Sequence, residues 1–158
     1  MAAEPQRMDL SKIAPDAYRH VLQLEGVIAR HVDRKLLHLI KLRASQINGC
    51  AYCVDMHSLD LRAEGETEQR IYALPVWRET PFFTERERAA LLWTEKLTLS
   101  AVEHVPDEVY EQVRPYFTDE ELVNLTLAIA AINAWNRFAV SFRSEPGHYT
   151  PKARPAKE

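Results

Sequence analysis

The sequence predicts a single-domain, all-α protein, and three observations support that prediction. The 158-residue chain contains only four glycines, at positions 26, 49, 65 and 147. No stretch alternates apolar and polar residues for long enough to indicate a half-buried strand. Apolar residues instead recur at helical spacing between capping residues and prolines. The length is sufficient for one hydrophobic core without crosslinks.

The first two helices are expected between residues 15 and 47. Pro15 suits the first position of a helix that runs to about Ala29. Asp33 can cap a second helix over residues 34–47, because its side chain can accept a hydrogen bond from a free backbone N–H. The Asn-Gly pair at 48–49 ends this helix.

Five further helices complete the predicted fold. Thr84 with Glu87 and Thr118 with Glu121 match the capping-box pattern, and Asp107 is expected to cap a short helix. Two short helices are expected to stop before Pro75 and Pro115. The expected ranges are about 50–63, 67–74, 84–99, 107–114 and 120–142. The last helix is apolar nearly all round, so we expect it to run through the centre or to be covered on one side by another subunit.

The chain divides into an N-terminal extension (residues 1–14), a helical domain (15–143) and a polar, proline-rich C-terminal tail (144–158) that is expected to extend or fray. A hydrophobic fraction of 46%, a charged fraction of 27% and a formal charge of −3 are typical of a soluble globular protein. They indicate no binding to nucleic acid or to a membrane. Neither a signal peptide nor a membrane-spanning run is recognised, so a cytoplasmic location is expected.

Both cysteines of the chain lie in one short segment, NGCAYCVDMH, with a histidine four residues after the second. On a helix Cys50, Cys53 and His57 project at about 0°, 300° and 340°, so they share one face. Residues three apart on a helix lie within reach of a reversible disulfide. The first turn of a helix also lowers a thiol pKa, and His57 can exchange a proton there. The simplest interpretation is a redox-active dithiol.

Two alternatives stay open at this point. Zinc accepts cysteine and histidine ligands, and the C-x2-C-x3-H pattern supplies three of them. A fourth would be water or a distant histidine, and no second ligand pair of the usual kind occurs. The two thiols could also be small core residues without a chemical task. We expect no metal and no cofactor.

The segment ASQINGCAYCVDMHSLDLRAEGE, followed by ERERAALLWTEKLT and AIAAINAWNRFA, resembles the alkylhydroperoxidase D-like branch of the carboxymuconolactone decarboxylase family. The resemblance covers about residues 15–143. It implies an all-helical fold that assembles into trimers or hexamers. It further implies a peroxidase that reduces organic hydroperoxides or hydrogen peroxide and is reset by an external dithiol, a lipoyl or thioredoxin-like partner.

The resemblance also implies a role for each site residue. Cys53 attacks the peroxide, Cys50 is the resolving residue and proton donor, and His57 belongs to a proton relay. The family carries a glutamate twelve residues before the first cysteine as the base of this relay, and His38 occupies that position in this sequence. His38 is therefore expected to be a modified relay member. A redox sensor or binding protein with little turnover, and a lactone decarboxylase-like enzyme, remain the alternatives.

Other polar and aromatic residues are expected to be structural. Asp60, three residues after His57, is interpreted as an exposed helical carboxylate, although it could hydrogen-bond that imidazole. The remaining expectations concern two groups. Asn133, Asn136 and Arg137 are expected to satisfy one another or neighbouring backbone at an interface, and Tyr72, Trp93, Trp135 and Phe138 are expected in the core or at subunit contacts.

Overall fold

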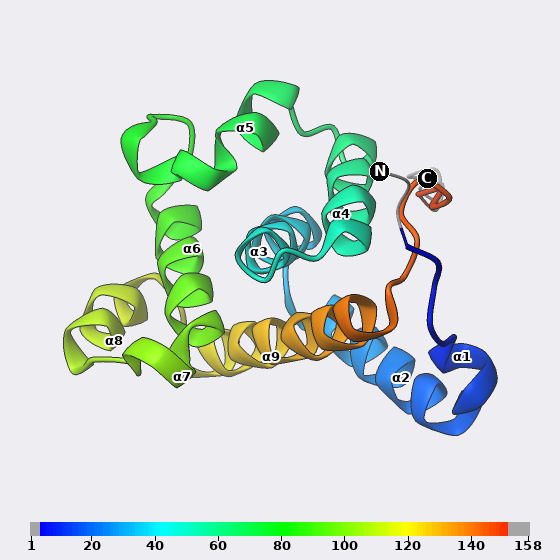
Figure 1. Cartoon of the computed structure of the whole chain (residues 1–158). Coiled ribbons are helices and arrows are strands. Elements are labelled where there is room, and N and C mark those ends of the chain that lie inside the picture. The colour runs from blue at the N-terminus through cyan, green and yellow to red at the C-terminus, as the bar shows by residue number, and fades with distance from the viewer. Residues whose placement is uncertain (1–3, 152–158) are drawn as a thin grey trace, which may run out of the picture.

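The computed structural model describes residues 4–151, which form a bundle of helices without a strand (Figure 1). The all-α prediction is therefore confirmed. The elements are α1 (Leu10–Ile13), α2 (Pro15–His31), α3 (Arg34–Ile47), α4 (Ala51–Ala63), α5 (Glu68–Ala73), the 3-10 helix η1 (Leu74–Glu79), α6 (Glu85–Thr98), α7 (Ser100–Glu103), α8 (Asp107–Val113), the 3-10 helix η2 (Arg114–Tyr116) and α9 (Asp119–Phe142). Residues 1–3 of the expected extension and 152–158 of the expected tail lie outside the described residues.

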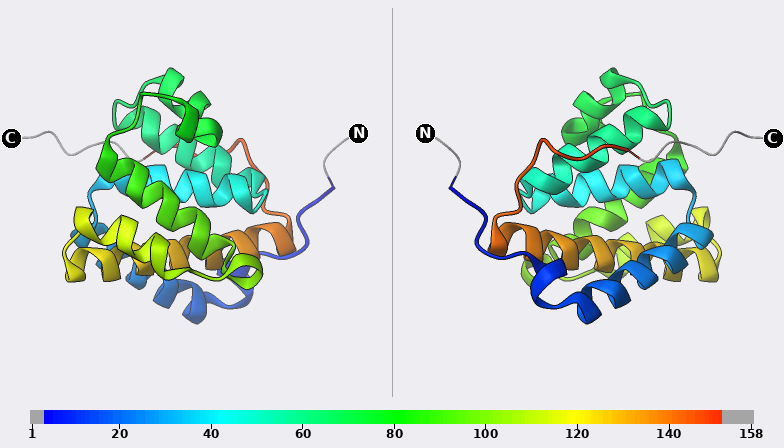
Figure 2. Two further views of the ribbon diagram at one scale, coloured as in Figure 1. Left: turned by 90° about the vertical axis from the view of Figure 1, so that its left-hand side faces the viewer. Right: turned by 90° about the vertical axis from the view of Figure 1, so that its right-hand side faces the viewer.

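The central element of the bundle is α3, which α4, α6 and α9 surround (Figure 1). Its residues Leu39, Ile40 and Leu42 are fully buried. The side views place α4 and α5 on one side of α3, and α9 with α2 on the other (Figure 2). The apolar helix α9 thus lies beside the centre rather than running through it. A row of its small and apolar side chains, Val123, Ala130 and Ala134, stays exposed.

Side-chain caps begin several helices as the sequence predicts. Asp33 Oδ1 accepts a hydrogen bond from the N–H of Leu36 at 2.9 Å. Complete capping boxes start α6 at Thr84 and α9 at Thr118. The expected cap at Asp107 is wrong by one position, because Pro106 is the N-cap and Asp107 is the first helical residue. There its carboxylate favours the helix through the positive end of the helix dipole.

The two short helices stop before Pro75 and Pro115 as predicted, since α5 ends at Ala73 and α8 at Val113. Pro75 falls in η1 and Pro115 in η2, and both occupy a first-turn position of the new turn. Such a position needs no backbone N–H donor, and the fixed φ of proline suits it. The chain therefore tightens at these prolines instead of leaving the helical region.

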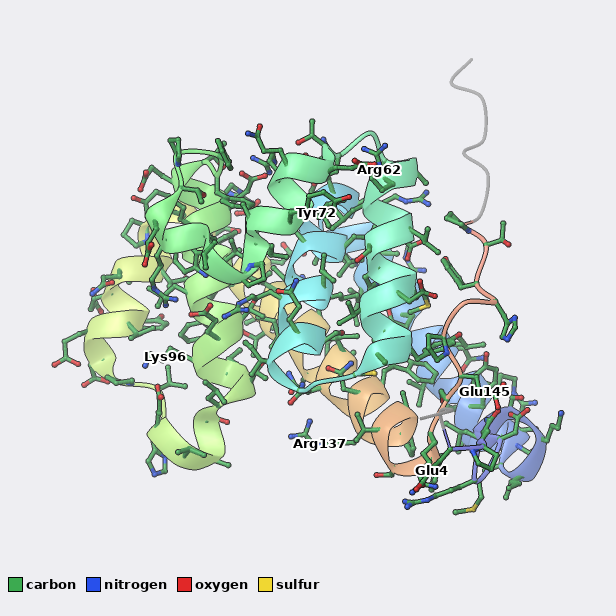
Figure 3. All side chains as sticks on the ribbon, turned by 45° about the horizontal axis from the view of Figure 1, so that its top comes forward. Glu4, Arg62, Tyr72, Lys96, Arg137 and Glu145 are labelled. Atoms are coloured by element: carbon green, nitrogen blue, oxygen red, sulfur yellow. The ribbon has the colours of Figure 1, made fainter. Side chains whose placement is uncertain are left out.

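Both ends of the described chain lie against the bundle. The Glu4 side chain lies near the C-terminal end of α9, where it forms an ion pair with Arg143 (Figure 3). Residues 144–151 form no helix and pass along α4 (Figure 1). There the N–H of Gly147 donates to Asp55 Oδ2 at 2.8 Å. Across residues 4–151, no helix has the length and apolar character needed to cross a bilayer.

Candidate active site

The turn between α3 and α4 positions the two cysteines. The N–H of Gly49 donates to the carbonyl of Gln46 at 3.3 Å, and the N–H of Cys50 donates to the carbonyl of Ser45 at 3.0 Å. This pair of bonds is a Schellman motif, which needs a left-handed residue after the helix end. Gly49 supplies it with φ at 64°. The motif fixes Cys50 directly after α3 and makes it the N-cap of α4.

Cys50 and Cys53 lie side by side in the buried cluster where α3, α4 and α9 meet. They are free thiols, 1% and 2% exposed, and they pack with Ala44, Ile132 and Ala139. The two cysteines therefore lie near each other in one buried cluster, as the sequence predicts.

The two thiols differ in acidity. A hydrogen bond from the Cys53 thiol is the main cause that lowers the pKa of Cys50 from 9.0 to about 7, and backbone groups of Cys53 and Tyr52 add to it. Burial opposes this shift. The neighbouring Cys50 and burial together raise the pKa of Cys53. The first proton of the pair is therefore lost from Cys50, at about pH 7, while the higher pKa of Cys53 keeps that thiol protonated.

A histidine–histidine–aspartate trio lies further along α3 and α4. The ring centroids of His38 and His57 are 5.7 Å apart. The Nδ1 atom of each ring lies 3.4 Å from Asp60 Oδ2. The structure thus brings His57 together with His38 from the preceding helix, and it adds Asp60 to them.

The expectation of an exposed Asp60 is wrong, because this residue is only 7% exposed. Cys53, His57 and Asp60 follow one another at i, i+4 and i+7, which is the spacing of a helix face that packs inward. In α4 that inward face carries ionisable side chains. The signal was present in the spacing, but the carboxylate was interpreted by its usual preference for the surface.

Burial and proximity set the charges of this trio. Burial lowers the pKa of His38 to about 4, against the opposing effect of Asp60. Burial also lowers the pKa of His57. Burial disfavours ionisation of Asp60, but its contacts with His57 and Tyr149 outweigh that effect and hold its pKa below the usual value. At neutral pH the trio consists of two neutral imidazoles and one carboxylate.

The C-terminal segment completes this part of the site. The hydroxyl of Tyr149 donates a hydrogen bond to Asp60 Oδ1 at 2.7 Å, across 89 positions of the sequence. No local pattern connects these two residues, so the sequence analysis did not find Tyr149.

A second cluster of polar side chains connects α3 and the α3–α4 turn to α9. Asn48 Nδ2 donates to Asn133 Oδ1 at 3.0 Å and to Asn136 Oδ1 at 2.9 Å, and Asn136 Nδ2 donates to Ser45 Oγ at 3.0 Å. Arg137 donates to the carbonyl of Asn133 at 2.9 Å. The expected contact within this group is confirmed for Asn133 and Arg137, whereas Asn136 bonds to the side chains of Asn48 and Ser45, and the expected interface stays a prediction. Asn136 also helps to lower the pKa of Cys50.

An ion pair and the aromatic residues complete the surroundings. Lys41, on α3, is buried and pairs with Glu25 of α2, which also accepts a hydrogen bond from Trp135 Nε1 at 2.9 Å. The sequence analysis did not predict this ion pair. Trp93 is buried as expected, whereas Tyr72 is 72% exposed on the outer surface of the bundle (Figure 3).

A paired-cysteine helical bundle with an adjoining imidazole is the class of protein that this fold and site define. The profile of the carboxymuconolactone decarboxylase family matches residues 15–96, more than half of the chain. The chain is 43% identical over 137 residues to the uncharacterized protein YdfG of Bacillus subtilis, covering 86% of this chain and 93% of that protein. The chain belongs to the carboxymuconolactone decarboxylase family.

Solved structures agree with this membership. A protein of unknown function from Agrobacterium tumefaciens, whose description proposes an antioxidant defence role of the AhpD type, is 46% identical with a TM-score of 0.88. The match covers 92% of this chain and 100% of that one. The alkylhydroperoxidase core of an uncharacterized peroxidase-related protein from Ralstonia eutropha has a TM-score of 0.77 at 23% identity, over 88% and 74% of the two chains. The fold is alkylhydroperoxidase D-like.

Proposed function

We propose that this protein is a thiol-dependent peroxidase that reduces organic hydroperoxides or hydrogen peroxide through Cys50 and Cys53. The observation that carries the proposal is the dithiol at the start of α4, where one thiol has a pKa of about 7 and is hydrogen-bonded to the other. The Cys50 thiolate can accept the proton of Cys53, and the Cys53 thiolate that results is the nucleophile that peroxide cleavage needs. The likeness to the solved alkylhydroperoxidase D-like proteins supports the same activity.

The proposed cycle uses both sulfur atoms. The Cys50 thiolate takes the proton of Cys53, and the resulting Cys53 thiolate attacks the outer oxygen of the peroxide. The O–O bond breaks, Cys53 becomes a sulfenic acid, and the proton now on Cys50 passes to the departing alkoxide, giving the alcohol. The Cys50 thiolate then attacks the sulfur of the Cys53 sulfenic acid, and the disulfide forms. The hydroxide that leaves takes up a proton and becomes water.

His57, with His38 and Asp60 behind it, is proposed to relay protons during this cycle. His57 lies one helical turn after Cys53 on the same inward face of α4. A neutral imidazole can accept a proton when the carboxylate of Asp60 stabilises the imidazolium that forms. His38 stands where the family resemblance implies a glutamate, so in this protein Asp60 is proposed to supply the negative charge.

The reductant, the assembly and the location follow from the same proposal. An external dithiol, from a lipoyl or thioredoxin-like protein, would attack the Cys50–Cys53 disulfide and leave as a disulfide itself. Both thiols are buried, so a reactant has to displace partly buried side chains such as Tyr52 and Trp135. A homo-oligomer, trimer or hexamer, in the cytoplasm is proposed.

The test is peroxide consumption by the purified chain with cumene hydroperoxide and a dithiol donor. We expect multiple turnovers in the wild type and none in Cys53→Ser. Dimedone, which traps sulfenic acids, should label Cys53 in the Cys50→Ser variant and should not label Cys50 in the Cys53→Ser variant. The opposite labelling would reverse the roles of the two cysteines.

A mass-spectrometric count of free thiols separates the peroxidase from a redox sensor. After one equivalent of peroxide the count should fall from two to zero, and dithiol should restore it within the time of one turnover. A disulfide that forms slowly, without multiple turnover with any dithiol donor, would identify a sensor instead. Comparing His38→Glu with the wild type would then measure the contribution of that relay position.

A further inference from the structure

The histidine–histidine–aspartate trio has a geometry that its role in proton transfer does not require. One ligand atom each from His38, His57 and Asp60 lies within 4.8 Å of the other two. Both contacts to Asp60 Oδ2 measure 3.4 Å. A closed hydrogen bond between an imidazole and a carboxylate is shorter, about 2.7–2.9 Å. The three side chains therefore converge without bonding tightly to one another.

His57 is the second observation at this cluster. It is 4% exposed, its Nδ1 atom has only the long 3.4 Å contact to Asp60, and its Nε2 atom has no hydrogen-bond partner among residues 4–151. The Nδ1 atom of His38 is also buried without a partner. Buried polar atoms normally have partners, so unpaired nitrogens that face a carboxylate need an explanation.

We propose that His38, His57 and Asp60 bind one divalent first-row transition-metal ion, with zinc as the reference case. In a tetrahedral zinc site the bonds are about 2.0–2.1 Å long, which places neighbouring ligand atoms about 3.3–3.4 Å apart. The two measured contacts to Asp60 Oδ2 have this length. The ion would give the unpaired Nδ1 atoms their partner, and the carboxylate would neutralise part of its charge.

The ligand set favours an ion that accepts imidazole and carboxylate together. Two histidines and one carboxylate bind zinc, iron, cobalt or nickel, whereas magnesium and calcium prefer oxygen ligands. Three protein ligands leave a fourth position for water or a small molecule, as in catalytic zinc sites. Tyr149 holds the second oxygen of Asp60, which is the usual outer-shell support of a ligating carboxylate.

This site differs from the zinc site considered from the sequence, which would use Cys50, Cys53 and His57. The proposal also departs from the sequence-based expectation that the protein binds no metal. Neither thiol is a ligand, so metal binding can be tested without the peroxidase cycle. A bound ion would occupy the same Nδ1 atoms and carboxylate that the proposed proton relay uses, so the metal-bound form and the relay-active form are alternative states.

The test titrates the full-length Cys50→Ser/Cys53→Ser double variant, freed of metal by chelator, with zinc and with cobalt. Calorimetry measures stoichiometry and affinity, and the visible absorption of cobalt reports its coordination. We expect one ion per chain with an affinity close to that of the wild type. No thiolate-to-cobalt charge-transfer band should appear in the double variant.

Added to this background, Asp60→Asn and His38→Phe should each weaken binding by at least about 100-fold, since losing an outer-shell partner alone costs about 10- to 100-fold. Tyr149→Phe, which removes such an outer-shell partner, should weaken binding by about 10- to 100-fold. Asp119→Asn, an exposed carboxylate in the first turn of α9, is the control and should leave affinity unchanged. Circular dichroism checks each fold, and if Asp60→Asn unfolds, His38→Phe and Tyr149→Phe decide. Loss of binding in the double variant itself would overturn the proposal, as would undiminished binding in both Asp60→Asn and His38→Phe.

Discussion

Cys50 and Cys53 belong to one short motif, yet their surroundings make them chemically different. Cys50 is the N-cap of α4, so backbone N–H groups of the first turn stabilise its thiolate. Cys53 lies inside the helix and donates its proton to Cys50. The two thiols are only three positions apart, and they differ in acidity because Cys50 caps the helix whereas Cys53 lies inside it.

The thiolate at Cys50 predicts a pH dependence. Because its pKa falls from 9.0 to about 7, the thiolate should form between about pH 6 and 8. Absorbance near 240 nm, which reports thiolates, should show this midpoint in the reduced protein. The depressed pKa of Cys50 adds to the stability of the fold as the pH rises from about 7 to 9, and the raised pKa of Cys53 opposes this above about pH 9.

Cys53→Ala tests the cause of that shift. The variant removes the thiol donor that contributes most to lowering the pKa of Cys50, so the midpoint should move up toward 9. An unchanged midpoint would show that the helix terminus alone accounts for the acidity of Cys50. Cys50→Ala provides the signal of Cys53 alone.

At the scale of elements, the site depends on how α3 is joined to α4 and held against α9. The Schellman motif at Gly49 reverses the chain and fixes Cys50 after α3. The Asn48, Asn133 and Asn136 side chains connect this turn to α9. Substitutions at Gly49 and Asn136 should therefore change the stability of the protein.

Gly49→Ala should destabilise the protein by about 1 kcal/mol. Gly49 has a φ of 64°, and a Cβ there would meet no atom within 4 Å, so the cost is backbone strain alone. Gly26→Ala, at an exposed position inside α2, should have the opposite sign and stabilise by about 0.5–1 kcal/mol. Urea unfolding with reductant present measures both. Equal effects of the two changes would refute the strain argument.

Asn136→Ala should lower the free energy of unfolding by about 2 kcal/mol. Asn136 is 1% exposed, and its loss leaves the donor of Asn48 and the hydroxyl of Ser45 with fewer partners in a buried site. The midpoint of Cys50 ionisation should also rise, because Asn136 hydrogen-bonds to that thiol. Asn124→Ala, a less buried amide on the same helix, should change stability by no more than about 0.5 kcal/mol and leave the thiol midpoint unchanged.

At the scale of the whole molecule, one side of α9 stays exposed within residues 4–151. Val123, Ala130 and Ala134 form an exposed row of small and apolar side chains along it. Small residues allow another helix to approach closely, and apolar area gains free energy when it is covered.

We therefore expect this row to lie in the interface of a trimer or hexamer. Ala130→Arg should reduce the mass measured by light scattering to that of a smaller species, because a long charged side chain cannot be buried there unpaired. Ala130→Ser keeps the size of the side chain and should keep the assembly. A wild-type monomer at all concentrations would contradict the expectation.

Local signals in the sequence determined the helices and the dithiol. Capping boxes at Thr84 and Thr118, the Asn-Gly helix end and the spacing of Cys50, Cys53 and His57 involve residues no more than a few positions apart. Their consequences depend on the helical repeat alone, so they can be derived without knowing the neighbours of each helix. For the same reason the ends of the two short helices before Pro75 and Pro115 were predicted correctly.

The tertiary structure alone decided which charged groups lie inside. Asp60 is buried because α3 brings His38 against it and the C-terminal segment brings Tyr149, from 22 positions before and 89 after it. Lys41 is buried because Glu25 of α2 pairs with it. Burial of a charge depends on a partner from another element, and no periodicity within one helix specifies that partner.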